Sequence, residues 1–180
     1  MRAFVAIELP KEIRERLYAF SAGIPGRITR VPEENLHITI LFLGEIGDGP
    51  AARAIEEVDK IDAATFTAEA SGVSYFGGSN MQSIFARIED RGRISSIHRL
   101  LREGLSGITR SEDRKQYVPH ATIARAKKDS HEARTFINLN SARAFGRFEV
   151  TSLCVKESVL TGNGPRYSTI HEHKLNAPAV

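Results

Sequence analysis

The triplet His-x-Thr occurs twice in this chain of 180 residues, as His37-Ile38-Thr39 and as His120-Ala121-Thr122. Two further pairs of segments align on either side of these triplets. AFVAIE (3–8) aligns with IFARIE (84–89), and FTAEASGV (66–73) aligns with FEVTSLCV (148–155). The offsets are 83, 81 and 82 residues, which is nearly constant. Ordered matches at one offset indicate an internal duplication of a unit of roughly 80 residues.

Both copies predict the same order of elements, a strand, a helix, a strand with the histidine, a second helix and a third strand. Residues 3–8 form the first strand, and Ile13, Leu17 and Phe20 recur on one face of the helix that Pro10 can open. The corresponding stripe in the second copy is Ile94, Ile97, Leu101 and Leu105.

The remaining elements follow from local signals. Pro50 opens the second helix of the first copy, and Ser130 caps its counterpart. The third strands lie around 66–75 and 148–157, and GGSN (77–80) is a hairpin turn that joins the two copies. Residues 158–175 contain GNGP between two strands and therefore predict a terminal hairpin.

These elements predict an α+β fold, a bilobal internal duplication in which two antiparallel sheets are backed by helices around a central cleft. The whole chain, 1–180, is expected to form a single domain. Its lobe-forming repeats are approximately 1–80 and 81–157, followed by the hairpin 158–175.

Composition limits the environment and the partners of the protein. The chain is 41% hydrophobic, and its one cysteine, Cys154, excludes an internal disulfide. Its longest apolar stretch is far shorter than a membrane span. We therefore expect a cytoplasmic protein without a membrane partner.

Charge is divided unequally between the two copies. Residues 1–80 hold 8 Lys and Arg against 12 Asp and Glu, which gives −4, whereas residues 81–180 hold 17 against 10, which gives +7. A basic half is compatible with a polyanionic partner such as nucleic acid, although it is equally typical of solvated helix faces.

The paired triplets carry the chemistry. In a strand, residues i and i+2 point to the same face, so each histidine shares a face with its threonine. Two imidazoles in one cleft can serve as acid and base, and hydroxyl groups can donate to phosphate oxygens, which suits phosphoryl transfer without a metal. A zinc site is the competing interpretation, but neither triplet has a third ligand within a few residues on its own face.

Beyond the triplets, the sequence resembles the 2H phosphoesterases, and among them the RNA 2′,3′-cyclic phosphodiesterases, long called 2′-5′ RNA ligases. The residues that carry this resemblance are MRAFVAIELP (1–10), NLHITILFLGE (35–45), YVPHATIARAK (117–127) and VLTGNGPRYSTIHEHKL (159–175). The resemblance implies a bilobal fold and metal-independent opening of a 2′,3′-cyclic phosphate, which leaves a 2′-phosphate.

The resemblance also implies roles for individual residues. His37 is the proton donor and His120 the proton acceptor, while Thr39 and Thr122 hold phosphate oxygens. Arg125 corresponds to an arginine that is common after the second motif, but its odd spacing from His120 requires a strand end or a bulge to bring it to the phosphate.

Two residues near the expected cleft have weaker signals. Phe42 occupies the place in the first copy that Arg125 occupies in the second, and it can either stack on a base or belong to the core. Tyr167, after GNGPR, can reach the cleft from the terminal hairpin.

The expected function is metal-independent hydrolysis of RNA 2′,3′-cyclic phosphate ends by a two-histidine mechanism, with no cofactor, in a monomer. Two alternatives stay open at this point. The same histidines can join RNA ends through a 2′-5′ bond without ATP, or the cleft can bind RNA ends without catalysis.

Overall fold

Helices and strands are interspersed along the computed structural model, which describes residues 1–77, 83–109, 116–127, 130–162 and 164–178. The elements in chain order are β1 (Arg2–Glu8), α1 (Lys11–Ser21), β2 (Ile28–Arg30), the 3-10 helix η1 (Glu33–Asn35), β3 (His37–Glu45), α2 (Asp48–Asp59), β4 (Phe66–Phe76), β5 (Ser83–Glu89), α3 (Arg93–Gly104), β6 (His120–Ala126), α4 (His131–Leu139), β7 (Ala144–Val150), β8 (Ser152–Thr161) and β9 (Gly164–Lys174).

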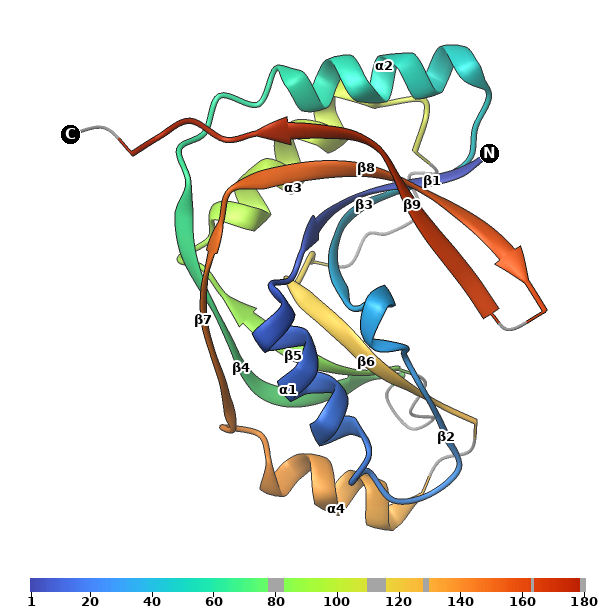
Figure 1. Cartoon of the computed structure of the whole chain (residues 1–180), viewed down its shortest axis with the longest axis vertical. Coiled ribbons are helices and arrows are strands. Elements are labelled where there is room, and N and C mark those ends of the chain that lie inside the picture. Colours follow the sequence, from blue (N-terminus) through green and yellow to red (C-terminus); the bar gives the residue numbers. More distant parts are fainter. Residues whose placement is uncertain (78–82, 110–115, 128–129, 163, 179–180) are drawn as a thin grey trace.

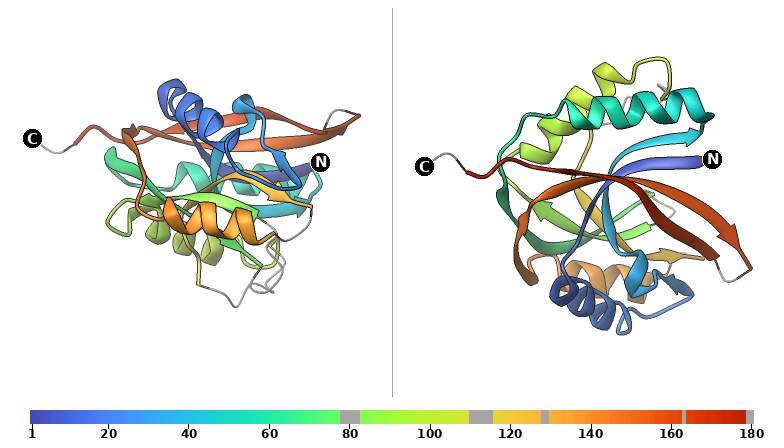
Figure 2. Two further views of the ribbon diagram at one scale, coloured as in Figure 1. Left: turned by 90° about the horizontal axis from the view of Figure 1, so that it is seen from below. Right: turned by 45° about the horizontal axis from the view of Figure 1, so that its top comes forward.

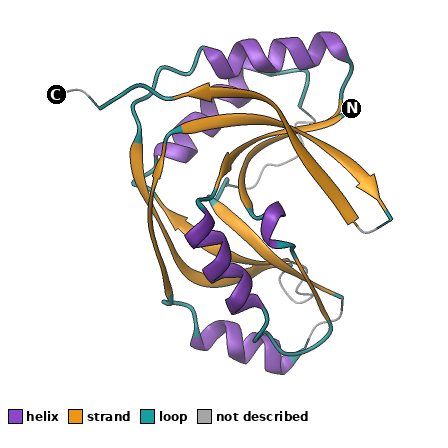
Figure 3. Cartoon of the chain, in the orientation of Figure 1, coloured by secondary structure: helices purple, strands orange, loops and turns teal. Residues whose placement is uncertain are grey.

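The strands form a curled antiparallel sheet in the order β7-β4-β5-β6-β3-β1-β8-β9, with β2 paired to β6. Figure 1 shows the strands forming one curved sheet, and Figure 3 distinguishes the helices from the strands. Helices α2 and α3 pack against the end of the sheet that contains β3, β8 and β9, whereas α1 and α4 pack against β4, β6 and β7. This arrangement confirms the predicted α+β fold with antiparallel strands backed by helices.

The strand order is symmetric about its centre. The lobe β3-β1-β8-β9 mirrors the lobe β6-β5-β4-β7, so β1 corresponds to β5, β3 to β6 and β8 to β4. The two predicted sheets are continuous through one residue pair, Ile38 of β3 opposite Ala121 of β6. Both side chains are 0% exposed, so the junction is part of the core.

The two lobes do not coincide with the repeats 1–80 and 81–157. Strand β4 of the first repeat pairs with β5 of the second, and β8 of the second pairs with β1 of the first. Each repeat therefore places its third strand in the lobe built around the first two strands of the other. Sequence matches at a constant offset reveal equivalent strands but not their partners, which is why the exchange was not predicted.

The single strand predicted over 148–157 is also wrong. It is divided at Thr151 into β7, which pairs with β4, and β8, which pairs with β1 and β9. An apolar alternation that runs through a short break cannot show that the chain has left one sheet edge for another. The terminal hairpin exists, but it begins at Ser152 because β8 is its first strand.

Local signals in the sequence account for the helices. The predicted stripe of α3 is buried, with Ile94 at 0%, Ile97 at 3% and Leu101 at 1% exposure. The hydroxyl of Ser130 accepts a hydrogen bond of 3.1 Å from the backbone N–H of Ala133 and so caps α4 as expected. Of the predicted turn 77–80, residues 78–80 lie outside the described residues.

Buried apolar side chains from both lobes belong to one contiguous core. In the right-hand view of Figure 2, α2 and α3 lie at one end of the molecule and α1 and α4 at the other. Within the described ranges, no helix combines the length and the apolar character that crossing a membrane requires.

Replacing Ser130 by alanine is expected to lower the free energy of unfolding by about 1 kcal/mol, because the N–H of Ala133 loses its acceptor. Urea denaturation followed by circular dichroism measures the change. Ser96→Ala is the control, since this exposed hydroxyl only donates to the Gly92 carbonyl within a formed helix. Equal stability of the Ser130 variant and the parent protein would contradict the capping role.

Candidate active site

A cleft of about 630 Å³ lies on the concave side of the sheet where the lobes meet. All six residues that the sequence predicted for the site line it, and they are His37, Thr39 and Phe42 from β3 and His120, Thr122 and Arg125 from β6. The structure therefore brings both motifs to one place.

The pairing of Ile38 with Ala121 explains this convergence. In an antiparallel pair, the neighbours of two opposed residues are also opposed, so His37 stands across from Thr122 and Thr39 stands across from His120. The two histidines are then diagonal neighbours, and an undistorted ladder separates their α-carbons by about 7–8 Å. The site is a two-by-two array of imidazoles and hydroxyls.

A β-bulge in each motif strand brings a further residue to the cleft. In β3, Leu41 is opposite Val5 and Thr39 is opposite Ala6, so Ile40 is the extra residue. After this bulge, Phe42 points to the cleft.

Strand β6 contains an equivalent bulge. There, Ala124 is opposite Ile84 and Thr122 is opposite Phe85, so Ile123 is the extra residue. The bulge that the position of Arg125 required is therefore present.

The exposure of Phe42 and Arg125 fits contact with a ligand. Phe42 is 66% exposed, which excludes the core position that the sequence left open. Arg125 is exposed as well, and its guanidinium donates a hydrogen bond of 3.4 Å to the Ser83 hydroxyl. An exposed ring and an exposed cation at equivalent positions give the two walls of the cleft different chemistry.

Backbone carbonyls fix the tautomer of both histidines. Nδ1 of His37 lies 2.7 Å from the Asn35 carbonyl, and Nδ1 of His120 lies 2.7 Å from the Val118 carbonyl. Because a carbonyl oxygen only accepts, each Nδ1 carries the proton and each neutral ring has its lone pair on Nε2. Nε2 of His37 accepts from the Thr39 hydroxyl at 2.9 Å.

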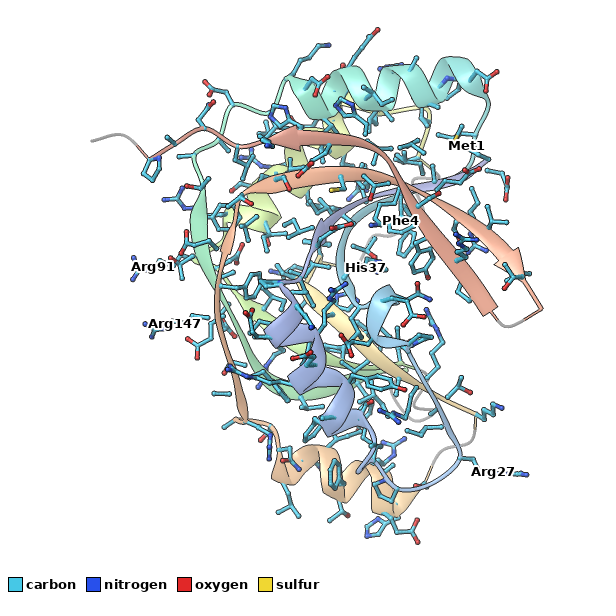
Figure 4. All side chains as sticks on the ribbon, in the orientation of Figure 1. Met1, Phe4, Arg27, His37, Arg91 and Arg147 are labelled. Carbon is cyan, nitrogen blue, oxygen red and sulfur yellow. The ribbon has the colours of Figure 1, made fainter. Side chains whose placement is uncertain are left out.

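Aromatic side chains hold both imidazoles in place. The ring of Phe4 is 5.0 Å from that of His37, and both are labelled in Figure 4. The Tyr167 ring stands edge-on to His37 at 5.2 Å, so the terminal hairpin does reach the cleft. In the other lobe, Phe85 and Phe76 pack on His120 at 5.1 and 4.9 Å.

This surrounding lowers the pKa of both histidines. Burial lowers the pKa of His37 from 6.5 to about 4, with a further decrease from the charges of Lys156 and His120. The Asn35 carbonyl and Glu8 act in the opposite direction. Burial also lowers the pKa of His120, against the effect of the Val118 carbonyl. In the protein alone, both imidazoles are therefore neutral at pH 7.

Sequence reasoning missed several residues of the cleft, including Arg2, Phe4 and Phe76. The alternation in β1 could have identified the first two, since Arg2 and Phe4 are two residues apart on one face. The carbonyls of Asn35 and Val118 left no signal, because a backbone atom is independent of residue type.

Proteins of similar sequence are known for nearly the full length of the chain. The family model of the 2′-5′ RNA ligase superfamily matches residues 6–159. The RNA 2′,3′-cyclic phosphodiesterase of Archaeoglobus fulgidus is 30% identical over 174 residues, which cover 94% of this chain and 98% of that protein. The protein of the same name from Methanocaldococcus jannaschii is 29% identical over 177 residues, covering 96% and 99%.

Solved structures share the fold over nearly the full length. A crystal structure of a protein from Thermus thermophilus superposes with a TM-score of 0.84 at 26% identity and covers 99% of this chain and 100% of its own. E. coli LigT complexed with 3′-AMP superposes with a TM-score of 0.80 at 21% identity, with 97% of both chains covered.

Sulfate, which does not titrate near neutral pH, is expected to bind more tightly as the pH falls from about 7 to 5. An anion beside the neutral imidazoles favours their charged form, so binding takes up protons. Calorimetry in buffers of different ionisation enthalpy measures this uptake. His37→Ala and His120→Ala should reduce it, whereas His171→Ala, outside the cleft lining and paired with Asp59, should not. Binding without proton uptake would contradict the assignment of neutral histidines.

Proposed function

The chain belongs to the 2′-5′ RNA ligase superfamily, and on that premise we propose that it hydrolyses the 2′,3′-cyclic phosphate at RNA 3′ ends to a 2′-phosphate. Relatives named RNA 2′,3′-cyclic phosphodiesterase align over nearly the whole chain, which supports phosphodiesterase activity. The single observation that carries the proposal is the array of two histidines and two threonines in one cleft.

Hydrolysis requires one proton to leave the attacking water and another to reach the departing oxygen. His120 accepts the proton of the water at Nε2 while the water oxygen bonds to phosphorus. The bond from phosphorus to O3′ breaks, and His37 delivers its proton to O3′. The product carries a 2′-phosphate and a free 3′-hydroxyl, and the two imidazoles have exchanged protonation states.

The negative charge of the substrate explains how His37 becomes protonated. The imidazole is neutral in the protein alone at pH 7, because its pKa is lowered to about 4 by burial. A cyclic phosphate diester brings one negative charge into the cleft and raises that pKa, so His37 is protonated as the substrate binds.

Neighbouring polar groups stabilise the phosphate. The hydroxyls of Thr39 and Thr122 donate to its non-bridging oxygens, and the exposed guanidinium of Arg125 balances the charge that develops during attack. Phe42 offers an exposed ring on which a base of the RNA can stack.

The proposal includes no metal and no cofactor. The imidazoles and hydroxyls of the cleft supply the acid, the base and the hydrogen-bond donors that this hydrolysis uses. The cleft is built from one chain, which supports action as a monomer, and we place the protein in the cytoplasm with RNA 3′ ends as its partner.

The same array permits one alternative reaction. If the 5′-hydroxyl of a second RNA replaces water, it bonds to phosphorus as the bond to O3′ breaks, and a 2′-5′ linkage results. A third possibility is an RNA-end-binding module without turnover. Product analysis separates these outcomes, so both are included in the test.

An oligoribonucleotide with a 2′,3′-cyclic phosphate, incubated with the protein and a chelator, is expected to gain one water and end in a 2′-phosphate. His37→Ala and His120→Ala should each reduce the rate about 10²–10⁴-fold, because each removes one proton-transfer step. Mass spectrometry identifies the product, and phosphatase sensitivity distinguishes a terminal phosphate from a diester.

The matched control is His171→Ala, since this histidine lies outside the cleft lining. An RNA with a 5′-hydroxyl is added in parallel, so that a longer product reports end joining. Unchanged substrate mass in every reaction, or full activity in both cleft variants, would rule out the proposed hydrolysis.

The dependence of kcat/KM on pH is expected to be bell-shaped, with its maximum between about 4 and 6.5. The donor must be protonated and the acceptor neutral, and both pKa values are lowered by burial from 6.5. The rate constant therefore falls as the pH rises toward 8, where neither His37 nor His120 is protonated at Nε2, and falls again below the lower pKa. Initial rates across this range test the profile, and a maximum above pH 7.5 would contradict it.

A further inference from the structure

Lys156 is a buried lysine on the cleft face of the first lobe, and none of the steps above uses it. The residue is 9% exposed and lies in β8, opposite Phe4 of β1 and Thr169 of β9. Lysine is almost never buried without a partner, so the groups around its ammonium indicate what it does there.

Glu8 and Thr169 are those groups. Nζ of Lys156 donates to Oε1 of Glu8 and, at 3.0 Å, to the Thr169 hydroxyl, which donates at 3.2 Å to the same carboxylate oxygen. The hydrogen bond from Lys156 is the main cause of the lowered pKa of Glu8. The carboxylate of Glu8 is therefore charged at neutral pH, which matches its hydrogen bond with the ammonium of Lys156.

This charge pair stands directly beside His37. Glu8 is the residue opposite His37 in the ladder between β1 and β3, so their side chains share the cleft face with β-carbons about 5 Å apart. Lys156 is opposite Phe4, whose ring packs on His37 at 5.0 Å. In Figure 1, β1 runs between β3 and β8, which brings all three side chains onto neighbouring strands.

We propose that Glu8 and Lys156 are positioning residues that set the protonation equilibrium of His37 and make it electrostatically different from His120. The catalytic meaning of this pair rests on the proposed function, but the equilibrium itself is a property of the protein alone.

The two charges do not cancel at His37. The Lys156 side chain is 11% exposed and the Glu8 side chain 57% exposed, so water screens the carboxylate more than the ammonium. The net effect disfavours a positive imidazole. In agreement, the charge of Lys156 lowers the pKa of His37 more than the charge of Glu8 raises it. Other charged groups that act on the pair or its surroundings are Arg14, near Glu8, and Glu172, near Cys154.

Among the described residues of the second lobe, no such pair stands beside His120. The residue opposite His120 is Arg87, whose guanidinium donates to the Ser141 carbonyl rather than to a carboxylate. The residue opposite Phe85, where the first lobe has Lys156 opposite Phe4, is the uncharged Ser74. The cleft is symmetric in its histidines and threonines but asymmetric in the charges next to them.

This asymmetry links proton loading to the ligand. Without an anion, the ammonium of Lys156 helps to keep His37 neutral, and with a phosphate in the cleft the added negative charge outweighs it. His37 then gains its proton when the cyclic phosphate binds, and the O3′ oxygen of that phosphate later receives the proton.

Titration of the His37 Cε1–H resonance by NMR tests the pair in the full chain without substrate, and His37→Ala identifies the resonance. Lys156→Met is expected to raise the pKa of His37 and Glu8→Gln to lower it, each by about half a unit. The double variant, which removes both charges, should fall between the single variants. Opposite shifts from two partners of one ion pair are not expected from a purely structural role.

Glu89→Gln is the matched control, since this exposed residue is the sequence equivalent of Glu8 in the second copy and should leave His37 unshifted. The His120 resonance serves as an internal control for folding, and Lys156→Arg keeps the charge if methionine is not tolerated. In that case, Lys156→Arg should titrate like the parent protein while Glu8→Gln still lowers the pKa.

Shifts of the same sign in Lys156→Met and Glu8→Gln, or no shift in either, would overturn the proposal. Failure of the proposed function has a different signature, namely absence of turnover in the parent protein. Because the titration uses no substrate, opposite shifts together with absent turnover would retain the pair and reject the reaction.

Discussion

The pairing of Ile38 with Ala121 is the constraint on which the site depends. This residue pair links β3 to β6 within the sheet, and both side chains are fully buried, so the link is fixed by packing as well as by backbone hydrogen bonds. Since these are the central residues of the two His-x-Thr triplets, their pairing sets all four polar side chains in one array. A shift of one residue in register would turn the histidines toward the core.

Much of this arrangement was predictable because it depends on local pattern. The alternating side-chain faces around His37 and His120 and the helix cap at Ser130 depend only on residues close in sequence. The structure contains each of these features. The partner of each third strand was not predictable, because two equivalent copies offer each edge two equivalent partners. The bulges at Ile40 and Ile123 were partly predictable. The spacing between His120 and Arg125 required a bulge or a strand end but did not show at which residue a bulge would lie.

Duplicated geometry with unequal surroundings is the main property of the cleft. Each imidazole has a backbone carbonyl at Nδ1 and aromatic rings packed beside it. These contacts are common to the two copies of the repeat. The Glu8–Lys156 pair lies beside His37 in one lobe, and Phe42 in that lobe occupies the position that Arg125 occupies in the other. A donor and an acceptor of one shape must differ in protonation, and unequal charges beside equal backbones are one way to make two imidazoles differ.

The exchange of β4 and β8 between the lobes limits what a single copy of the repeat can be. One copy alone would have two strands of one lobe and a third strand that belongs to the other, so its edges would be paired only against a second copy. Such a unit would need a second copy, in a strand-exchanged dimer with the histidines near its twofold axis, to pair these edges. In this chain the two repeats are joined in one polypeptide, so a residue can change in one repeat without changing in the other. One half of a symmetric site can then acquire charges that the other half lacks.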